Sequence, residues 1–142
     1  MKKGQIRAIA ICIFRKNDLI LVSEGFDELK QEYYYRPIGG GIEYGETSSN
    51  ALKREVLEEI GANITNEKFL GAFENIFTYN GDLGHEIVFV YDADFVDKSF
   101  YDKPSFLGWE DNGVPFKLYW KPISDFKNEK IVLVPEELLT LL

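Results

Sequence analysis

One stretch of the sequence, residues 39–62, constrains the fold and the chemistry of this chain more than any other. It reads GGGIEYGETSSNALKREVLEEIGA, so it opens with three glycines and closes with a run rich in carboxylates. Apolar residues at helical spacing predict a helix with one buried face over about residues 47–60. Thr47 can cap the start of that helix through its hydroxyl, and Gly61 can end it because glycine tolerates positive φ.

Three glutamates, Glu55, Glu58 and Glu59, are spaced to project from nearly the same side of the predicted helix. Like charges at this spacing repel each other, so a helix selected only for stability would avoid them. Arg54 offsets part of the repulsion, and a divalent cation would offset the rest, because Mg²⁺ prefers oxygen ligands such as carboxylates, water and phosphate. A solvated acidic helix face is the alternative, and the spacing alone leaves both interpretations open.

The glycine loop and the acidic helix belong to one longer pattern. From Gly40, five residues lead to Glu46, and seven more lead to the run Arg54-Glu55-Val56-Leu57-Glu58-Glu59-Ile60-Gly61-Ala62. This pattern resembles the signature box of the Nudix hydrolases, G-x5-E-x7-R-E-U-x-E-E-x-G-U, in which U is a bulky aliphatic residue. Every fixed residue of the box is present, and Ala62 departs from the pattern only at a packing position. Weaker similarity to the family extends over most of the remaining chain.

The resemblance implies a single Nudix domain over residues 1–142 with an α/β fold, an α/β/α sandwich around a central mixed β-sheet. Composition and apolar patterning predict strands at 5–14, 19–25, 33–38, 68–79, 85–95 and 116–123. The first two of these strands are expected to form a hairpin. Residues 97–115 are predicted to be an irregular loop, and residues 135–142 a final helix with Pro135 in its first turn.

The resemblance also implies roles for residues of the box. Glu55 and Glu59 match metal-binding positions, and Glu58 matches a position that could be a ligand or the general base. Gly40 is expected to offer backbone groups to the metal and Gly39 to the substrate, since glycine permits close approach.

Two further box residues are expected to support the catalytic group. Arg54 matches the position that pairs with a glutamate and holds the acidic cluster in place. Glu46 matches the fixed glutamate of the box and is expected to assist that network or the metal.

Outside the box, the general base has two candidates. Glu110, next to Asp111 in the 97–115 segment, is preferred, and Glu86 in a predicted strand follows it. Arg36, just before the glycine loop, is a candidate for substrate binding. His85, the only histidine, is expected to be a structural side chain.

The aromatic residues offer a weaker indication of a substrate. A base could stack on members of the group Tyr33, Tyr34, Tyr35, Phe77 and Tyr79, although core packing is the default for each. Tyr79 lies 17 residues past the box, where a tyrosine marks dinucleoside polyphosphate hydrolases of the family. In a chain with eight tyrosines this coincidence does not fix the substrate.

The activity implied by the resemblance is hydrolysis of a phosphoanhydride in a nucleoside diphosphate linked to another moiety, by attack of water on phosphorus. Mg²⁺, with Mn²⁺ as an alternative, would neutralise the phosphate oxygens and lower the pKa of a bound water. A non-catalytic nucleotide-sensing module of the same fold and an acidic metal-binding domain without turnover are the rival hypotheses. Hydrolysis of any nucleotide in the presence of the metal would separate them.

Charge and composition limit the partners. A net charge of −8 argues against binding of a nucleic-acid polymer and favours a small nucleotide received through a metal ion. The single cysteine, Cys12, excludes an intramolecular disulfide and favours a reducing, cytoplasmic compartment. No apolar run approaches 18 residues, so neither a membrane span nor a membrane partner is expected. The sequence leaves a monomer and a homodimer open.

Overall fold

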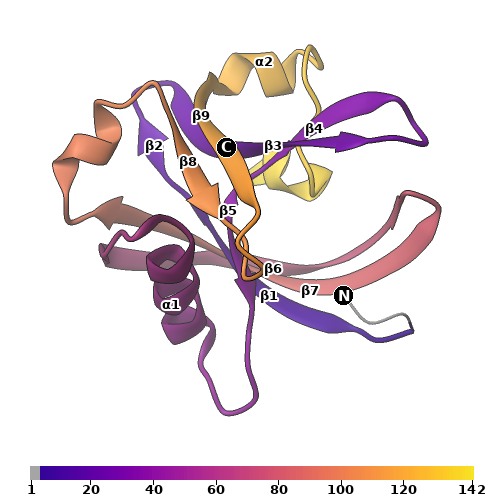
Figure 1. Cartoon of the computed structure of the whole chain (residues 1–142), viewed down its shortest axis with the longest axis horizontal. Coiled ribbons are helices and arrows are strands. Elements are labelled where there is room, and N and C mark those ends of the chain that lie inside the picture. The colour runs from indigo at the N-terminus through magenta and orange to yellow at the C-terminus, as the bar shows by residue number, and fades with distance from the viewer. Residues whose placement is uncertain (1–3) are drawn as a thin grey trace.

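The computed structural model describes residues 4–142 and contains two β-sheets with helices on both sides (Figure 1). The first sheet is mixed and has the strand order β5-β1-β7-β6. Strand β1 is parallel to β7 and antiparallel to β5, and β6 is antiparallel to β7. The bounds of these strands are Arg7–Ile13 for β1, Ile38–Gly41 for β5, Ile64–Tyr79 for β6 and Asp82–Phe95 for β7.

The second sheet is antiparallel, with the order β2-β3-β9-β8 and β4 paired to β3. Its strands are β2 (Arg15–Lys16), β3 (Leu19–Asp27), β4 (Glu32–Arg36), β8 (Ser105–Trp109) and β9 (Pro115–Pro122). The chain crosses from this sheet to the mixed one at Pro37, which separates β4 from β5. This crossing delivers the glycine run of β5 to the boundary between the two sheets.

The helices lie on opposite sides of the sheets (Figure 1). Helix α1 (Ser48–Ile60) covers one side, while α2 (Ile123–Lys127) and the 3₁₀ helix η2 (Glu136–Leu141) lie on the other, and a second 3₁₀ helix, η1 (Lys98–Tyr101), follows β7. The hydroxyl of Thr47 accepts a hydrogen bond from the backbone of Asn50 at 3.1 Å, and Gly61 ends the helix with φ of 68°. The helix predicted over 47–60 and both of its ends are confirmed.

Two apolar clusters share strand β1, because alternate residues of a strand point to opposite faces. Ala10 and Cys12 face the cluster under α1, whereas Ile9, Ile11 and Ile13 face the cluster on the side of α2 and η2. Burial raises the pKa of the Cys12 thiol well above its usual value. Cys12 therefore packs in the core as a small apolar residue.

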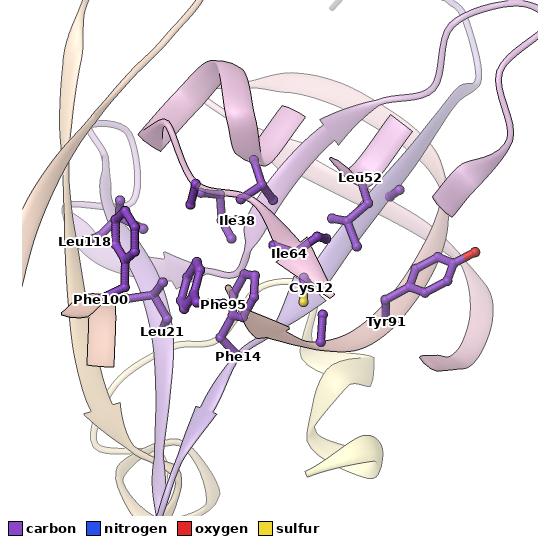
Figure 2. Packing of buried hydrophobic residues seen from close by; sticks show 14 of the residues in the cluster. Cys12, Phe14, Leu21, Ile38, Leu52, Ile64, Tyr91, Phe95, Phe100 and Leu118 are labelled. Atoms are coloured by element: carbon purple, nitrogen blue, oxygen red, sulfur yellow. The ribbon is translucent and has the colours of Figure 1, made fainter. Parts of the chain in front are cut away.

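Aromatic rings fill the cluster under α1 (Figure 2). The rings of Phe14 and Phe95 stack with centroids 4.0 Å apart, and Phe100 stacks on Phe95 at 4.9 Å. Leu52 of α1 is fully buried in the same cluster. Each such side chain contributes about 1.5–3 kcal/mol through burial, so the cluster fixes α1 against the sheet.

The predicted hairpin of residues 5–14 and 19–25 is wrong. Strand β1 pairs with β5 and β7, and the short β2 takes its place as the hairpin partner of β3. Strand β1 is buried on both faces, so it pairs with β5 and β7 from farther along the chain rather than with β3.

One further segment differs from expectation. Residues 97–115 contain η1 and β8 instead of being irregular throughout, because Phe100 and Phe106 pack against the core. The final helix is found as predicted, as the 3₁₀ helix η2 with Pro135 just before its first residue. Within residues 4–142, no helix combines the length and apolarity needed to cross a lipid bilayer.

Candidate active site

A cavity of about 210 Å³ lies where the glycine run of β5 meets α1. Gly39 and Gly40 form one wall, Glu55 and Glu59 project from α1, and Glu110 lies in the turn between β8 and β9. Tertiary packing therefore brings together residues from three separate parts of the chain.

Glycine is required at both wall positions for a steric reason. A β-carbon on Gly40 would lie 2.5 Å from the carboxyl carbon of Glu55, and one on Gly39 would lie 2.1 Å from the carbonyl oxygen of Ala10. Gly39 also has φ of 151°, which other residues rarely adopt. Gly39 therefore lets β5 lie against the backbone of β1, and Gly40 lets the carboxylate of Glu55, a residue only 9% exposed, lie against β5.

Glu59 shares the cavity with Glu55. Burial, a hydrogen bond with Glu55 and the negative charges of Glu55 and Glu110 all raise the pKa of Glu59, and Arg36 opposes them. Two carboxyl groups this close disfavour simultaneous ionisation unless a positive charge lies between them.

The guanidinium of Arg54 holds the acidic residues of the box in place. It donates two hydrogen bonds to Glu46, at 2.8 and 2.9 Å, and one to the carbonyl oxygen of Gly41 at 2.9 Å. It also donates to Glu55 at 3.0 Å and to Glu58 at 3.3 Å. These bonds lower the pKa of Glu46 to about 2 and raise the pKa of Arg54. Arg54 thus joins α1 to the loop that precedes it.

Of the three box glutamates, Glu58 is the one that the cavity lining does not include. Its side chain is 48% exposed, binds Arg54 and does not line the cavity. The same nitrogen of Arg54 donates to the carboxylates of Glu55 and Glu58, so Glu58 lies next to Glu55 although only Glu55 and Glu59 line the cavity. Among residues 4–142 no three His, Cys, Asp or Glu side chains are close enough to hold an ion together.

The residues present nevertheless fit a hard divalent cation. Glu55 and Glu59 supply carboxylate oxygens, and the absence of a β-carbon at Gly40 lets the Glu55 carboxylate lie against the backbone of β5. Mg²⁺ is usually held by one or two carboxylates, with water and phosphate completing its shell. The oxygen-only donor set therefore suits Mg²⁺ or Mn²⁺.

The two candidate bases outside the box lie in different places. Glu110 and Asp111 line the same cavity as Glu55 and Glu59. Glu86 is buried in β7 and lines a neighbouring cavity of about 540 Å³, as does Tyr79. His85 lines neither of these two cavities.

Three residues line both cavities, and the sequence predicts a site role individually for only one of them, Arg36. Arg7 and Tyr34, together with the predicted Arg36, line both cavities. Tyr34 was one of five aromatic candidates, whereas Arg7 had no assigned role. The only sequence signal for Arg7 is a polar residue at the start of an apolar strand, which does not by itself indicate a site.

Comparison with known proteins identifies the family and the fold. The chain matches the NUDIX domain family model over residues 4–139, and it belongs to that family. The structure resembles a NUDIX hydrolase from Nitrosomonas europaea, with a TM-score of 0.58 and 17% identity over 92% of this chain and 82% of that one. It also resembles a MutT protein from Bacillus halodurans, with a TM-score of 0.57 and 19% identity over 92% and 76% of the respective chains. The predicted α/β Nudix fold is confirmed, and an antiparallel sheet accompanies the mixed one.

A relative identified by sequence shares a short segment. The RNA pyrophosphohydrolase of Sulfurovum sp. (strain NBC37-1) is 54% identical over 41 residues, which is 29% of this chain. The matched segment spans a quarter of that relative's length.

Proposed function

We propose that this protein is a metal-dependent Nudix hydrolase that cleaves a phosphoanhydride in a nucleoside diphosphate linked to another moiety. The observation that carries this proposal is the juxtaposition of Glu55 and Glu59 at the glycine bend, in a cavity that Arg36 and Glu110 also line. A cavity with carboxylates for a cation and arginines for phosphate suits a polyphosphate substrate.

Glu55 and Glu59, with the backbone at Gly40, would hold Mg²⁺ or Mn²⁺. The bound ion would neutralise phosphate oxygens and lower the pKa of a coordinated water. Glu58, whose carboxylate accepts a hydrogen bond from Arg54, supports this arrangement through that contact.

The remaining residues position the reactants. Glu110 accepts a proton from the attacking water, because it shares the cavity while belonging to a different element from the metal-binding helix. Arg7 and Arg36 bind phosphate oxygens through guanidinium groups, which suit phosphate geometry. Arg54 and Glu46 keep Glu55 oriented, so their contribution is structural.

The test is hydrolysis of a nucleotide panel with Mg²⁺ or Mn²⁺, with and without a chelator. The panel contains nucleoside triphosphates, nucleotide sugars, dinucleoside polyphosphates and, because the Sulfurovum relative is named for RNA, a 5′-triphosphorylated oligoribonucleotide. Turnover that requires the metal is expected for at least one free nucleotide. Incorporation of ¹⁸O from labelled water then identifies the attacked phosphorus, and binding without turnover across the panel would favour a sensing module.

A further inference from the structure

The larger cavity, about 540 Å³, is formed by two β-hairpins and the segment before η2. Its walls come from β3 and β4, from β6 and β7, and from residues 132–137. Small-molecule pockets typically measure about 300–1,000 Å³. The smaller cavity, at about 210 Å³, is below that range, so it suits phosphates and an ion but not a whole nucleotide.

Two aromatic rings in the larger cavity pack against glycines of the neighbouring strand. Gly25 pairs with Tyr34, and a β-carbon on Gly25 would lie 2.3 Å from the Tyr34 ring. Gly84 pairs with Phe77, and a β-carbon there would also lie 2.3 Å from the Phe77 ring. Each ring thus occupies the space that a side chain opposite would need, which fixes its position across the strand pair.

The tips of the two hairpins also contact each other. The backbone N–H of Glu28 donates to Oδ1 of Asn80 at 3.2 Å, and Nζ of Lys30 donates to the carbonyl oxygen of Thr78 at 3.3 Å. The rings of Tyr34 and Tyr79 meet edge to face with centroids 5.8 Å apart. These contacts set the separation of the aromatic walls before any ligand arrives.

Charge is unevenly distributed along the two cavities. Arg7 and Arg36 lie at their junction, because each lines both. Away from the junction both cavities are acidic: the larger one is lined by one lysine and five carboxylates (Asp27, Glu32, Glu86, Glu136 and Glu137), and the smaller one by five carboxylates that include the proposed metal ligands Glu55 and Glu59. A phosphate is therefore attracted to the junction and disfavoured farther inside the larger cavity, where an uncharged group with hydrogen-bond donors is better accommodated.

We infer that the larger cavity binds the nucleoside of the substrate. The base would lie against the rings of Phe77 and Tyr34, and the phosphates of the substrate would lie at Arg7 and Arg36. This inference rests on the proposed function and names the part of the substrate that the second cavity recognises. Stacking on rings already held in place accounts for recognition of a planar base.

The test compares hydrolysis of a nucleoside triphosphate with that of inorganic tripolyphosphate, which lacks the nucleoside. Phe77→Leu removes the flat ring, and Gly84→Ala displaces it, because the added β-carbon would lie 2.3 Å from the ring. Each variant is expected to lower kcat/KM for the nucleoside triphosphate by roughly tenfold through KM, without changing hydrolysis of tripolyphosphate. Gly71→Ala is the matched control, because a β-carbon on this β6 glycine would meet nothing within 4 Å.

Calorimetric titration with nucleoside monophosphates, together with thermal unfolding of each variant, separates this inference from the proposed function. If the parent protein binds the monophosphates and both variants bind them roughly tenfold more weakly, the inference holds even without hydrolysis. Equal losses on both substrates, or unchanged monophosphate binding by folded Phe77→Leu and Gly84→Ala proteins, would overturn it.

Discussion

Neighbouring glutamates of α1 differ in environment although they are adjacent in sequence. Glu59 lies in the cavity beside Glu55, while Glu58 accepts a hydrogen bond from Arg54 and does not line the cavity. Arg54 donates to the carboxylates of both Glu55 and Glu58, whereas Glu59 hydrogen-bonds with Glu55. The glutamates of α1 therefore have separate chemical roles, although they belong to one acidic run.

This difference predicts unequal effects of two conservative substitutions. Glu59→Gln is expected to reduce kcat/KM for the best nucleotide substrate by at least about 100-fold, because it removes a metal-binding carboxylate. Glu58→Gln is expected to cost about tenfold or less, since this side chain acts through Arg54. Steady-state kinetics on both proteins measure the difference, and equal losses would argue that Glu58 enters the cavity when the metal binds.

The Glu46–Arg54 pair predicts a specific dependence of stability on acid. The pKa of Glu46 is lowered from 4.5 to about 2 in the folded protein, so the pair stabilises the fold above pH 4.5. That contribution is lost as the pH falls from 4.5 toward 2. Urea unfolding of the parent and of Glu46→Gln should give free energies of unfolding that converge over this range. A constant difference between the two proteins would contradict the assignment.

At the scale of elements, the stability of α1 depends on the burial of its apolar face. The geometry of the site depends on the close approach of α1 to β5. Leu52 is fully buried, whereas Leu57 on the same helix is 49% exposed. Leu52→Ala is therefore expected to lower the free energy of unfolding by about 2–5 kcal/mol. The matched Leu57→Ala is expected to change it by about 0.5 kcal/mol or less. Denaturant unfolding followed by circular dichroism measures both.

The contact between β5 and α1 predicts an effect on activity that exceeds the effect on folding. In Gly40→Ala the added carbon would lie 2.5 Å from the Glu55 carboxyl carbon, so this carboxylate must move. Activity is expected to fall by about 100-fold, as for loss of a ligand, while the protein still unfolds cooperatively. Gly45→Ala is not a suitable control because Gly45 has φ of 85°, so Gly71→Ala serves instead. Full activity of Gly40→Ala would show that the Glu55 position is not critical.

At the scale of the whole molecule, the two apolar clusters lie between the sheets and helices and include none of the carboxylates of the site. The metal is therefore expected to add stability by binding rather than to be required for folding. At a Mg²⁺ concentration about 100 times its dissociation constant, binding contributes about 2.7 kcal/mol, which should raise Tm by roughly 5–10 °C. A protein carrying both Glu55→Gln and Glu59→Gln should show no such rise in calorimetry. A similar rise in that variant would place the ion elsewhere.

Local features of the fold could be predicted because they depend on neighbours in sequence. Thr47 and Gly61 mark the ends of α1 through capping chemistry that involves only adjacent residues. The pairing of β1 could not be predicted in this way, because its partners β5 and β7 begin about 30 and 75 residues farther along the chain. For the same reason, the sequence does not predict that Arg7 lines the cavity.

The sequence by itself determined the family, the helix that carries the glutamates and the glycine bend beside it, since these follow from residue types at short, fixed spacings. Only the tertiary structure decided which carboxylates meet in the cavity and which outer residues join them. Glu110, Arg36 and Arg7 approach the site from separate strands and turns. They converge because of how the strands pair within each sheet and how the two sheets lie against each other, which no local sequence pattern encodes.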